Sequence, residues 1–190
     1  MQQQQIAVSG LGGQGVLFVT KLLAEAALRK DFSVLVSETH GMAQRGGHVI
    51  SHLKVYARTN PETPLPTDPL TASPLTSPLI RPGCADVLLA LHEEGLAAHG
   101  YLLRPDGVLF CHRPQPKALG DINTVGLAQK LGNPVAANVV LLGFAVAKGA
   151  LFCTIEDLKA VLAQSTGKRA ALSLQALEAG AQAAFSCRGG

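Results

Sequence analysis

A glycine cluster near the amino terminus constrains the fold of this chain more than any other feature. A short apolar run at residues 6–9 stops at Gly10, and Gly12 and Gly15 follow at the spacing of the Gly-x-Gly-x-x-Gly fingerprint. Residues 14–29 then repeat apolar side chains along one helical face. A strand, a glycine turn and a helix in this order predict a Rossmann-like α/β fold, with a mostly parallel sheet flanked by helices.

The same turn predicts a site for an anionic group. Its free backbone N–H groups and the positive end of the helix dipole face whatever lies above the turn. The additional Gly13 allows a large group or a second chain to approach the backbone closely. A tight crossover that needs glycine only for packing is the alternative. The candidate cofactor-binding residues here are Gly10, Gly12, Gly13, Gln14 and Gly15.

The remaining pattern predicts further strands and a helical carboxyl-terminal half. Apolar runs predict strands at residues 33–37, 48–56, 86–91 and 108–111, with a turn at 101–107. Helical periodicity and caps predict helices at residues 93–99, 125–131, 134–148, 155–164 and 168–185. We expect the strand at 86–91 and the helix at 134–148 to be buried. Leu17 and Phe18 make the first turn of the helix at 14–29 apolar on several sides, which indicates that this end is covered.

A proline-rich segment interrupts the alternation of strands and helices at residues 58–82. Seven prolines lie between Pro61 and Pro82, and this density excludes a regular element. The segment is either an exposed or disordered loop, or an ordered arm that lies on a neighbouring molecule. We expect residues 1–190 to form a single domain that includes this segment.

A second polar motif follows the strand at residues 33–37. Glu38 stands where a dinucleotide-binding enzyme holds ribose hydroxyls, but the next residues are polar and rich in glycine. An arginine there suits a carboxylate or a phosphate, and glycines let the backbone come close. A surface loop in which Arg45 pairs with Glu38 is the alternative. The candidate residues of this motif, expected at the same sheet edge as the glycine turn, are Glu38, His40, Gln44, Arg45, Gly46 and Gly47.

The composition narrows the class of partner. The net charge of +3 is mild and no basic stripe is present, which argues against a nucleic-acid partner. No apolar run is long enough to cross a membrane and no signal-peptide pattern is present, so a cytoplasmic protein is expected. The 15% of charged residues is low, which favours a surface partly covered by a partner.

No metal site is expected, because no C-x-x-C pair occurs among Cys84, Cys111, Cys153 and Cys187.

Both glycine motifs resemble those of one family, the γ subunits or domains of 2-oxoacid:ferredoxin oxidoreductases. Within that family the chain is most similar to the β subunit of the indolepyruvate ferredoxin oxidoreductases. The resemblance covers nearly the whole chain. It rests on Gly-Leu-Gly-Gly-Gln-Gly at 10–15, Glu-Thr-His-Gly-Met-Ala-Gln-Arg-Gly-Gly at 38–47, and the segments at 101–107 and 131–143. The proline-rich stretch before Arg81 is longer than the usual connection in the family.

The resemblance implies an oxidative decarboxylation of a 2-oxoacid by a complex of several subunits. An aryl-pyruvate, coenzyme A and oxidised ferredoxin would give acyl-CoA, carbon dioxide and reduced ferredoxin. Thiamine diphosphate, Mg²⁺ and iron–sulfur clusters would belong to a large partner subunit, with coenzyme A as co-substrate. Arg45 and the Gly12–Gly15 turn would contact anionic groups, and His40 and Gln44 would line the site. No catalytic residue is assigned, and the chain alone would be inactive and either monomeric or homodimeric.

Three other functions remain open from the sequence. A stand-alone nucleotide-binding enzyme would use Glu38 on the ribose of NAD or FAD. An adenylating enzyme would also carry Gly-x-Gly-Gly-x-Gly after its first strand, but this chain lacks the usual catalytic or paired cysteines. A scaffold would only stabilise its partner.

Overall fold

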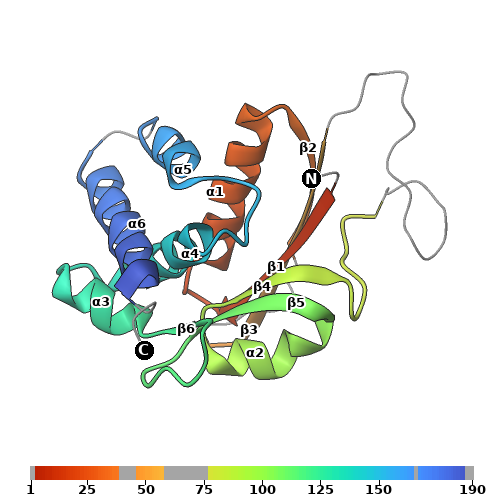
Figure 1. Cartoon of the computed structure of the whole chain (residues 1–190), viewed down its shortest axis with the longest axis horizontal. Helices are drawn as coiled ribbons and strands as arrows, with labels where there is room; N and C mark the ends of the chain where they lie inside the picture. The colour runs from red at the N-terminus through yellow and green to blue at the C-terminus, as the bar shows by residue number, and fades with distance from the viewer. Residues whose placement is uncertain (1–2, 39–45, 58–76, 165–166, 187–190) are drawn as a thin grey trace.

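The sheet of this chain has six strands with one reversed member. The computed structural model describes residues 3–38, 46–57, 77–164 and 167–186 (Figure 1). Their strand order is β2-β3-β1-β4-β5-β6. The strands are β1 (Gln3–Leu11), β2 (Phe32–Glu38), β3 (His48–Ala57), β4 (Ala85–Ala90), β5 (Leu103–His112) and β6 (Asp121–Ile122).

Strand β3 runs antiparallel to both of its neighbours, β1 and β2, whereas β1, β4, β5 and β6 pair in parallel. Only residues 39–47 join β2 to β3, and a parallel crossover needs a dozen or more residues. The expected mostly parallel α/β sheet is confirmed, with β3 as its exception. The consequence for the site is that β3 separates β1 from β2.

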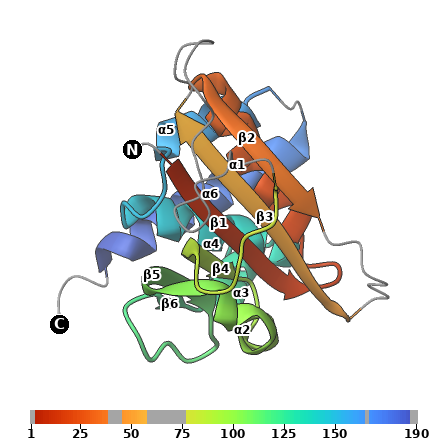
Figure 2. The same cartoon turned by 90° about the vertical axis from the view of Figure 1, so that its right-hand side faces the viewer.

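Helices lie on both faces of the sheet, but unequally (Figures 1 and 2). One face carries α1 (Val16–Arg29), α3 (Thr124–Lys130), α4 (Ala137–Ala147), α5 (Ile155–Leu162) and α6 (Lys168–Ser186). The other face carries α2 (Glu93–His99), followed by the 3-10 turn η1 (Gly100–Leu102). A second 3-10 turn, η2 (Pro134–Ala136), leads into α4.

The main core lies on the helix-rich face, and α4 is its centre. Residues 138–146 of α4 are all buried, as the apolar run predicted. Glycines let α4 and α6 approach closely, because a Cβ at Gly143 would lie 2.1 Å from the Leu177 carbonyl oxygen, and one at Gly180 would lie 2.0 Å from that of Val140. Among the described residues, no helix combines the length and hydropathy that a membrane crossing requires.

The face that carries α2 has a smaller core with polar members. Its apolar cluster consists of Ala7, Ile50, Ile80, Ala85, Leu88 and Leu102. His52 and Lys54 are also buried here, and the Ile80 N–H donates to Nδ1 of His52 over 3.3 Å. Most of the proline-rich segment, residues 58–76, lies outside the described residues, so its expected loop or arm stays a prediction.

Two local expectations were wrong, and one short strand was not predicted. The turn expected at 101–107 is largely strand, because β5 begins at Leu103 and includes Pro105. Proline is tolerated there because β6 pairs with β5 only at Cys111 and His112, which leaves the earlier part of β5 as a sheet edge. The two-residue strand β6 was too short to give a periodic signal, and the helix expected at 134–148 divides into η2 and α4.

The cysteines that the structure describes are buried or half-buried. Cys111 and Cys153 are buried, and burial raises the pKa of these thiols to about 11 and about 12. Cys84 is half-buried, and Cys187 lies outside the described residues. Within the described ranges, no group of three or more His, Cys, Asp or Glu side chains is arranged to hold a metal ion.

Candidate anion-binding site at the glycine turn

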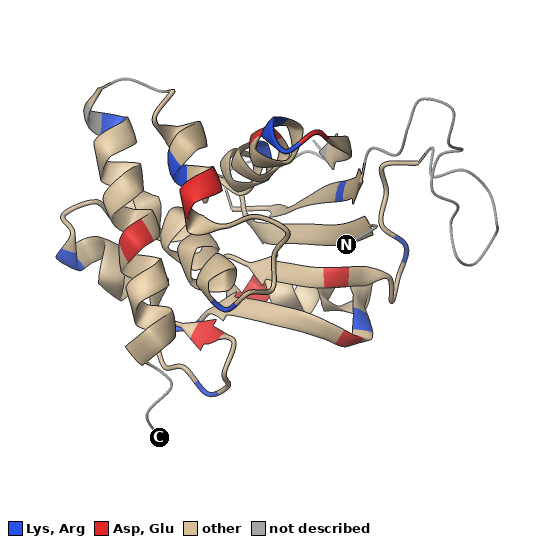
Figure 3. Ribbon diagram, turned by 45° about the horizontal axis from the view of Figure 1, so that its top comes forward, with Lys and Arg blue, Asp and Glu red and all other residues tan. Residues whose placement is uncertain are grey.

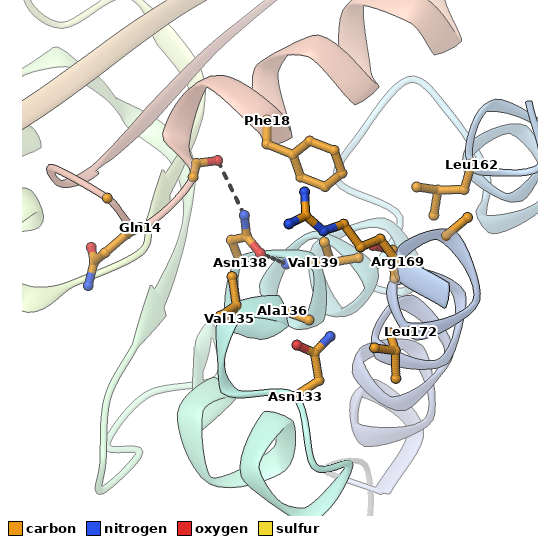
Figure 4. A pocket seen from close by; sticks show the side chains of 14 residues that line it. Gln14, Phe18, Asn133, Val135, Ala136, Asn138, Val139, Leu162, Arg169 and Leu172 are labelled. Carbon is orange, nitrogen blue, oxygen red and sulfur yellow. Dashed lines mark hydrogen bonds between the residues drawn. The ribbon is translucent and has the colours of Figure 1, made fainter. Parts of the chain in front are cut away.

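The glycine turn after β1 is held closed by Gln14. Its backbone N–H donates to the Leu11 carbonyl oxygen over 3.1 Å, and its Oε1 accepts from the Leu11 N–H over 2.8 Å. The Gln14 side chain therefore folds back on the turn, and Figure 4 shows it pointing away from the neighbouring cavity. Its observed role is to fix the turn.

The glycines of the turn serve different purposes. A Cβ at Gly10 would lie 2.8 Å from Gln14 Oε1, and one at Gly15 would lie 2.3 Å from Asn138 Nδ2, so a side chain at either position would displace a group that contacts the turn. Gly15 also has a φ of +79°, which favours glycine. Gly13 has a φ of +93° and nothing within 4 Å of an added Cβ. Its left-handed backbone thus stands in open space, where a ligand or a second chain can approach the peptide.

The two sequence motifs meet at one hydrogen bond. The Gly12 N–H donates to the Gly47 carbonyl oxygen over 2.9 Å, and Gly46 has a φ of +96°. Glu38 ends β2, and because β3 lies between β2 and β1 it is one strand removed from the turn. His40, Gln44 and Arg45 lie outside the described residues, so their contacts stay predictions.

Helix α2 supports the turn from the other face of the sheet. The buried Ser9 hydroxyl donates to the Gly95 carbonyl oxygen over 3.0 Å and lies 2.7 Å from Nδ1 of His99. When the single hydroxyl proton is donated to Gly95, Ser9 accepts from the Nδ1–H tautomer of His99. Burial and the neighbouring His48 lower the pKa of His99. These contacts fix the end of β1 immediately before the glycines.

A cavity of about 750 Å³ opens beside the turn, where α1, η2 with α4, and α6 all begin (Figure 4). Its wall is mainly apolar, and Figure 4 shows Phe18 and Arg169 pointing into it from α1 and α6. Arg169 is the charged side chain among its described lining residues. The lining comprises Gly13, Gln14, Gly15, Phe18, Asn133, Val135, Ala136, Asn138, Val139, Leu162, Arg169, Ala170, Leu172 and Ser173.

Asn138 lines both this cavity and a second hollow of about 200 Å³. The side chain is 8% exposed, its Nδ2 donates to the Gly15 carbonyl oxygen over 3.3 Å, and its Oδ1 accepts from the Val139 N–H. The smaller hollow lies between the turn and Leu91, at the ends of β1 and β4. The chain leaves these parallel strands toward opposite sides of the sheet, and such a switch point is where open α/β sheets bind ligands.

The arrangement suits an elongated anion with an apolar part. The N-termini of the helices and the Arg169 guanidinium favour a negatively charged group of the ligand, and the apolar wall favours its carbon skeleton.

The sequence did not identify Arg169, because no motif surrounds it and only the packing of α6 brings it to the turn. Asn133 and Asn138 lie in the segment 131–143, which the resemblance included without assigning a role. The first turn of α1, which we expected to be covered, is not covered by other residues of this chain, because Leu17 and Phe18 are 37% and 41% exposed.

Comparison with known proteins gives relatives along the whole chain. A family model described as pyruvate ferredoxin/flavodoxin oxidoreductase matches residues 5–183. The chain is 27% identical over 210 residues to a protein of Archaeoglobus fulgidus named indolepyruvate oxidoreductase subunit IorB, with 96% of both chains covered.

Solved structures share the fold. The γ subunit of a keto/oxoacid ferredoxin oxidoreductase from Geobacter sulfurreducens matches with a TM-score of 0.69 and 24% identity, covering 96% of this chain and 99% of that one. A 2-oxoglutarate:ferredoxin oxidoreductase from Magnetococcus marinus, solved with 2-oxoglutarate, coenzyme A and succinyl-CoA bound, matches with a TM-score of 0.73 and 19% identity. There the match covers 98% of this chain and 32% of the longer chain.

Proposed function

Because this chain belongs to the pyruvate ferredoxin/flavodoxin oxidoreductase family, we propose that it is the cluster-free subunit of an indolepyruvate-type 2-oxoacid:ferredoxin oxidoreductase. The complex would convert an aryl-2-oxoacid, coenzyme A and oxidised ferredoxin to acyl-CoA, carbon dioxide and reduced ferredoxin. The name of the Archaeoglobus relative, which is similar along nearly its whole length, supports the indolepyruvate type. The complex would work in the cytoplasm.

The difficult chemistry in this proposal belongs to a partner. A large subunit would hold thiamine diphosphate, Mg²⁺ and the iron–sulfur clusters, which decarboxylate the 2-oxoacid and pass electrons to ferredoxin. The residues of this chain would bind and orient the anionic co-substrate. No group in the described part of the chain has a geometry that requires a role in proton transfer.

The observation that carries the proposal is the turn with its cavity. The open peptide at Gly13, the adjoining start of α1 and the Arg169 side chain surround one space large enough for a nucleotide-sized ligand. We assign the phosphates of coenzyme A to the turn and Arg169, with the sequence-derived Arg45 as a further anion contact. Its organic part would lie along the apolar wall beside Phe18.

The stand-alone NAD or FAD enzyme is the weaker alternative. In a dinucleotide-binding fold the acidic residue lies on the strand beside β1, within reach of the ribose. Here β3 occupies that place, and Glu38 is one strand farther from the turn. Titration of the purified chain with NADH or FAD tests this alternative, and micromolar binding would favour it over the proposal.

Steady-state kinetics of the complex, co-expressed with its large subunit, test the proposed site. Arg169→Gln is expected to raise the KM for coenzyme A by about 10- to 100-fold, because a hydrogen bond between charged groups contributes about 1.5–3 kcal/mol. The KM for the 2-oxoacid should not change. Arg29→Gln, at the far end of α1, is the matched control. If both variants gave the wild-type KM for coenzyme A, the assigned site would be wrong.

A second variant tests the residue that only the sequence supports. Arg45→Ala should raise the KM for an anionic substrate of the assembled enzyme by about tenfold or more. If turnover and both KM values stayed at the wild-type level, Arg45 would have no place in the site.

A further inference from the structure

Strand β2 is an open edge of the sheet. It pairs with β3 on one side, and no other strand of the described residues lies on its other side. Its seven residues, Phe-Ser-Val-Leu-Val-Ser-Glu, contain no proline and no charged residue before the terminal Glu38, and charged residues and proline usually protect an edge from pairing. Val36 is 37% exposed on this strand. An apolar edge of this length is a template for pairing with another strand.

Helix α1 extends the same surface with an apolar stripe. Leu17, Lys21, Ala24 and Leu28 follow one another at helical spacing on one side of α1, and Leu17 and Leu28 are 37% and 56% exposed. A groove of about 330 Å³ between α1 and β2 is lined by Leu17, Phe18, Thr20, Lys21, Ala24 and Val36. The β2 edge and this stripe therefore form one continuous surface, which we call the β2–α1 surface.

We propose that the β2–α1 surface binds the same surface of a second copy of this chain, across a two-fold axis perpendicular to the sheet. Antiparallel pairing of the two β2 strands uses all seven residues when the axis passes beside Leu35. Val34 then lies opposite the second copy's Val36, and Ser33 opposite its Ser37. Pairs of β-branched residues and pairs of hydroxyl residues are both favourable across strands. The edge is self-complementary in this register.

The helices are complementary under the same axis. Because α1 lies over β2 and β3, the two copies of α1 run antiparallel beside the seam. Leu17 of one copy then approaches Leu28 of the other, and Lys21 approaches the opposite Glu25. Lys21 Nζ and Glu25 Oε1 are 3.7 Å apart within one chain, so the two-fold axis would bring two such pairs together with alternating charge. This charge pattern is why a second copy fits the surface.

Sedimentation equilibrium of the purified full-length chain tests the proposal. A dimer of the 19.7 kDa chain is expected. Val36→Lys should weaken dimerisation by about tenfold or more, because two lysines would enter an apolar seam. Val108→Lys is the matched control, since Val108 is also a strand valine and is 42% exposed. A monomeric wild-type chain, or a dimer that Val36→Lys leaves unchanged, would overturn the proposal.

Cross-linking tests the register independently of stability. Leu35→Cys should form a disulfide between copies under mild oxidation, because directly opposed strand residues have Cα atoms within the 4.4–6.8 Å range that a disulfide allows. Ser33→Cys should not, since each Ser33 would lie opposite Ser37. The wild-type chain controls for its own cysteines. Equal cross-linking of both variants, or none of Leu35→Cys, would exclude this register and with it the proposed dimer.

Discussion

On one face of the sheet, α1 and α3–α6 enclose an apolar core, whereas on the other face α2 covers a small cluster that includes buried polar side chains. On the first face, α4 and α6 interlock through glycines. On the second, His52, Lys54, Ser9 and His99 are buried or half-buried, and hydrogen bonds join Ser9 to Gly95 and His99, and His52 to Ile80. Figure 3 shows charged residues scattered over the elements in that view, without a stripe of one sign.

The two faces of the sheet contribute different features to the same glycine turn. The helix-rich face supplies the cavity, the start of α1 and Arg169. The α2 face supplies directional hydrogen bonds that hold the end of β1 in place. Apolar packing contributes more free energy than single hydrogen bonds do, but it specifies position less strictly. We therefore expect large stability effects on the first face and small, pH-dependent ones on the second.

The largest effect should follow from Gly180→Ala. The new methyl group would lie 2.0 Å from the Val140 carbonyl oxygen, so α4 and α6 must separate. We expect a loss of about 3–5 kcal/mol in the free energy of unfolding, measured with guanidinium chloride. Gly100→Ala, beside α2, is the control, because its Cβ would lie 3.4 Å from Leu96 and its backbone is right-handed helical. A loss of less than 1 kcal/mol at Gly180 would contradict the interlocked packing.

A matched pair of leucines compares the two cores directly. Leu23 in α1 and Leu88 in β4 are both 0% exposed, and they belong to different clusters. Leu23→Ala should lower the free energy of unfolding by about 4 kcal/mol, and Leu88→Ala by about 2–3 kcal/mol. The second loss is smaller because the short α2 can move to fill the space left. Equal losses would mean that both faces are packed with equal rigidity.

Much of the fold was accessible from the sequence because its signals are local. The strand, glycine turn and α1 were predicted, as were β4, α2 and the buried α4, because each has its own periodicity. The apolar periodicity of β3 is the same whether the strand runs parallel or antiparallel, so it could not predict the position of β3 between β1 and β2. That position depends on which strands pair with one another.

The site was predictable only where glycine carries the signal. Gly12 and Gly47 were both singled out, and the fold joins them by a hydrogen bond. Arg169 was missed, because a lone arginine in the first turn of a helix has no local feature that separates it from a solvated one. Gln14 was predicted to bind a cofactor, and this stays a prediction. The structure adds that its side-chain Oε1 accepts a hydrogen bond from the Leu11 N–H, a role that depends on the backbone geometry.

A pH titration tests the polar character of the α2 face. Burial, together with the charges of His99 and Lys54, lowers the pKa of His52 below 6.5. The neutral ring therefore contributes stability that is present above pH 6.5 and is lost as the pH falls through 6.5 toward the lowered pKa. The loss can reach about 1.4 kcal/mol per pH unit for this histidine.

The matched variant is His52→Asn, because the asparagine oxygen can accept from the Ile80 N–H as Nδ1 does. Chemical denaturation at about pH 7.5 and about pH 5.5 should show a weaker pH dependence in the variant than in the wild type. Identical pH dependence would show that His52 does not carry the effect.

The smallest expected difference lies in the helix caps of the two faces. Thr154 caps α5 reciprocally: Asp157 N–H donates to its hydroxyl over 3.2 Å, and the Thr154 N–H donates to Asp157 over 2.8 Å. Thr154→Ala should therefore lower the free energy of unfolding by about 1 kcal/mol, with Thr154→Ser close to the wild type. His92 caps the shorter α2 through one bond of 3.2 Å from the Glu94 N–H, so His92→Ala should lose about 0.5 kcal/mol. If thermal denaturation showed a larger loss for His92→Ala than for Thr154→Ala, the cap of α2 would contribute more stability than the cap of α5, contrary to this prediction.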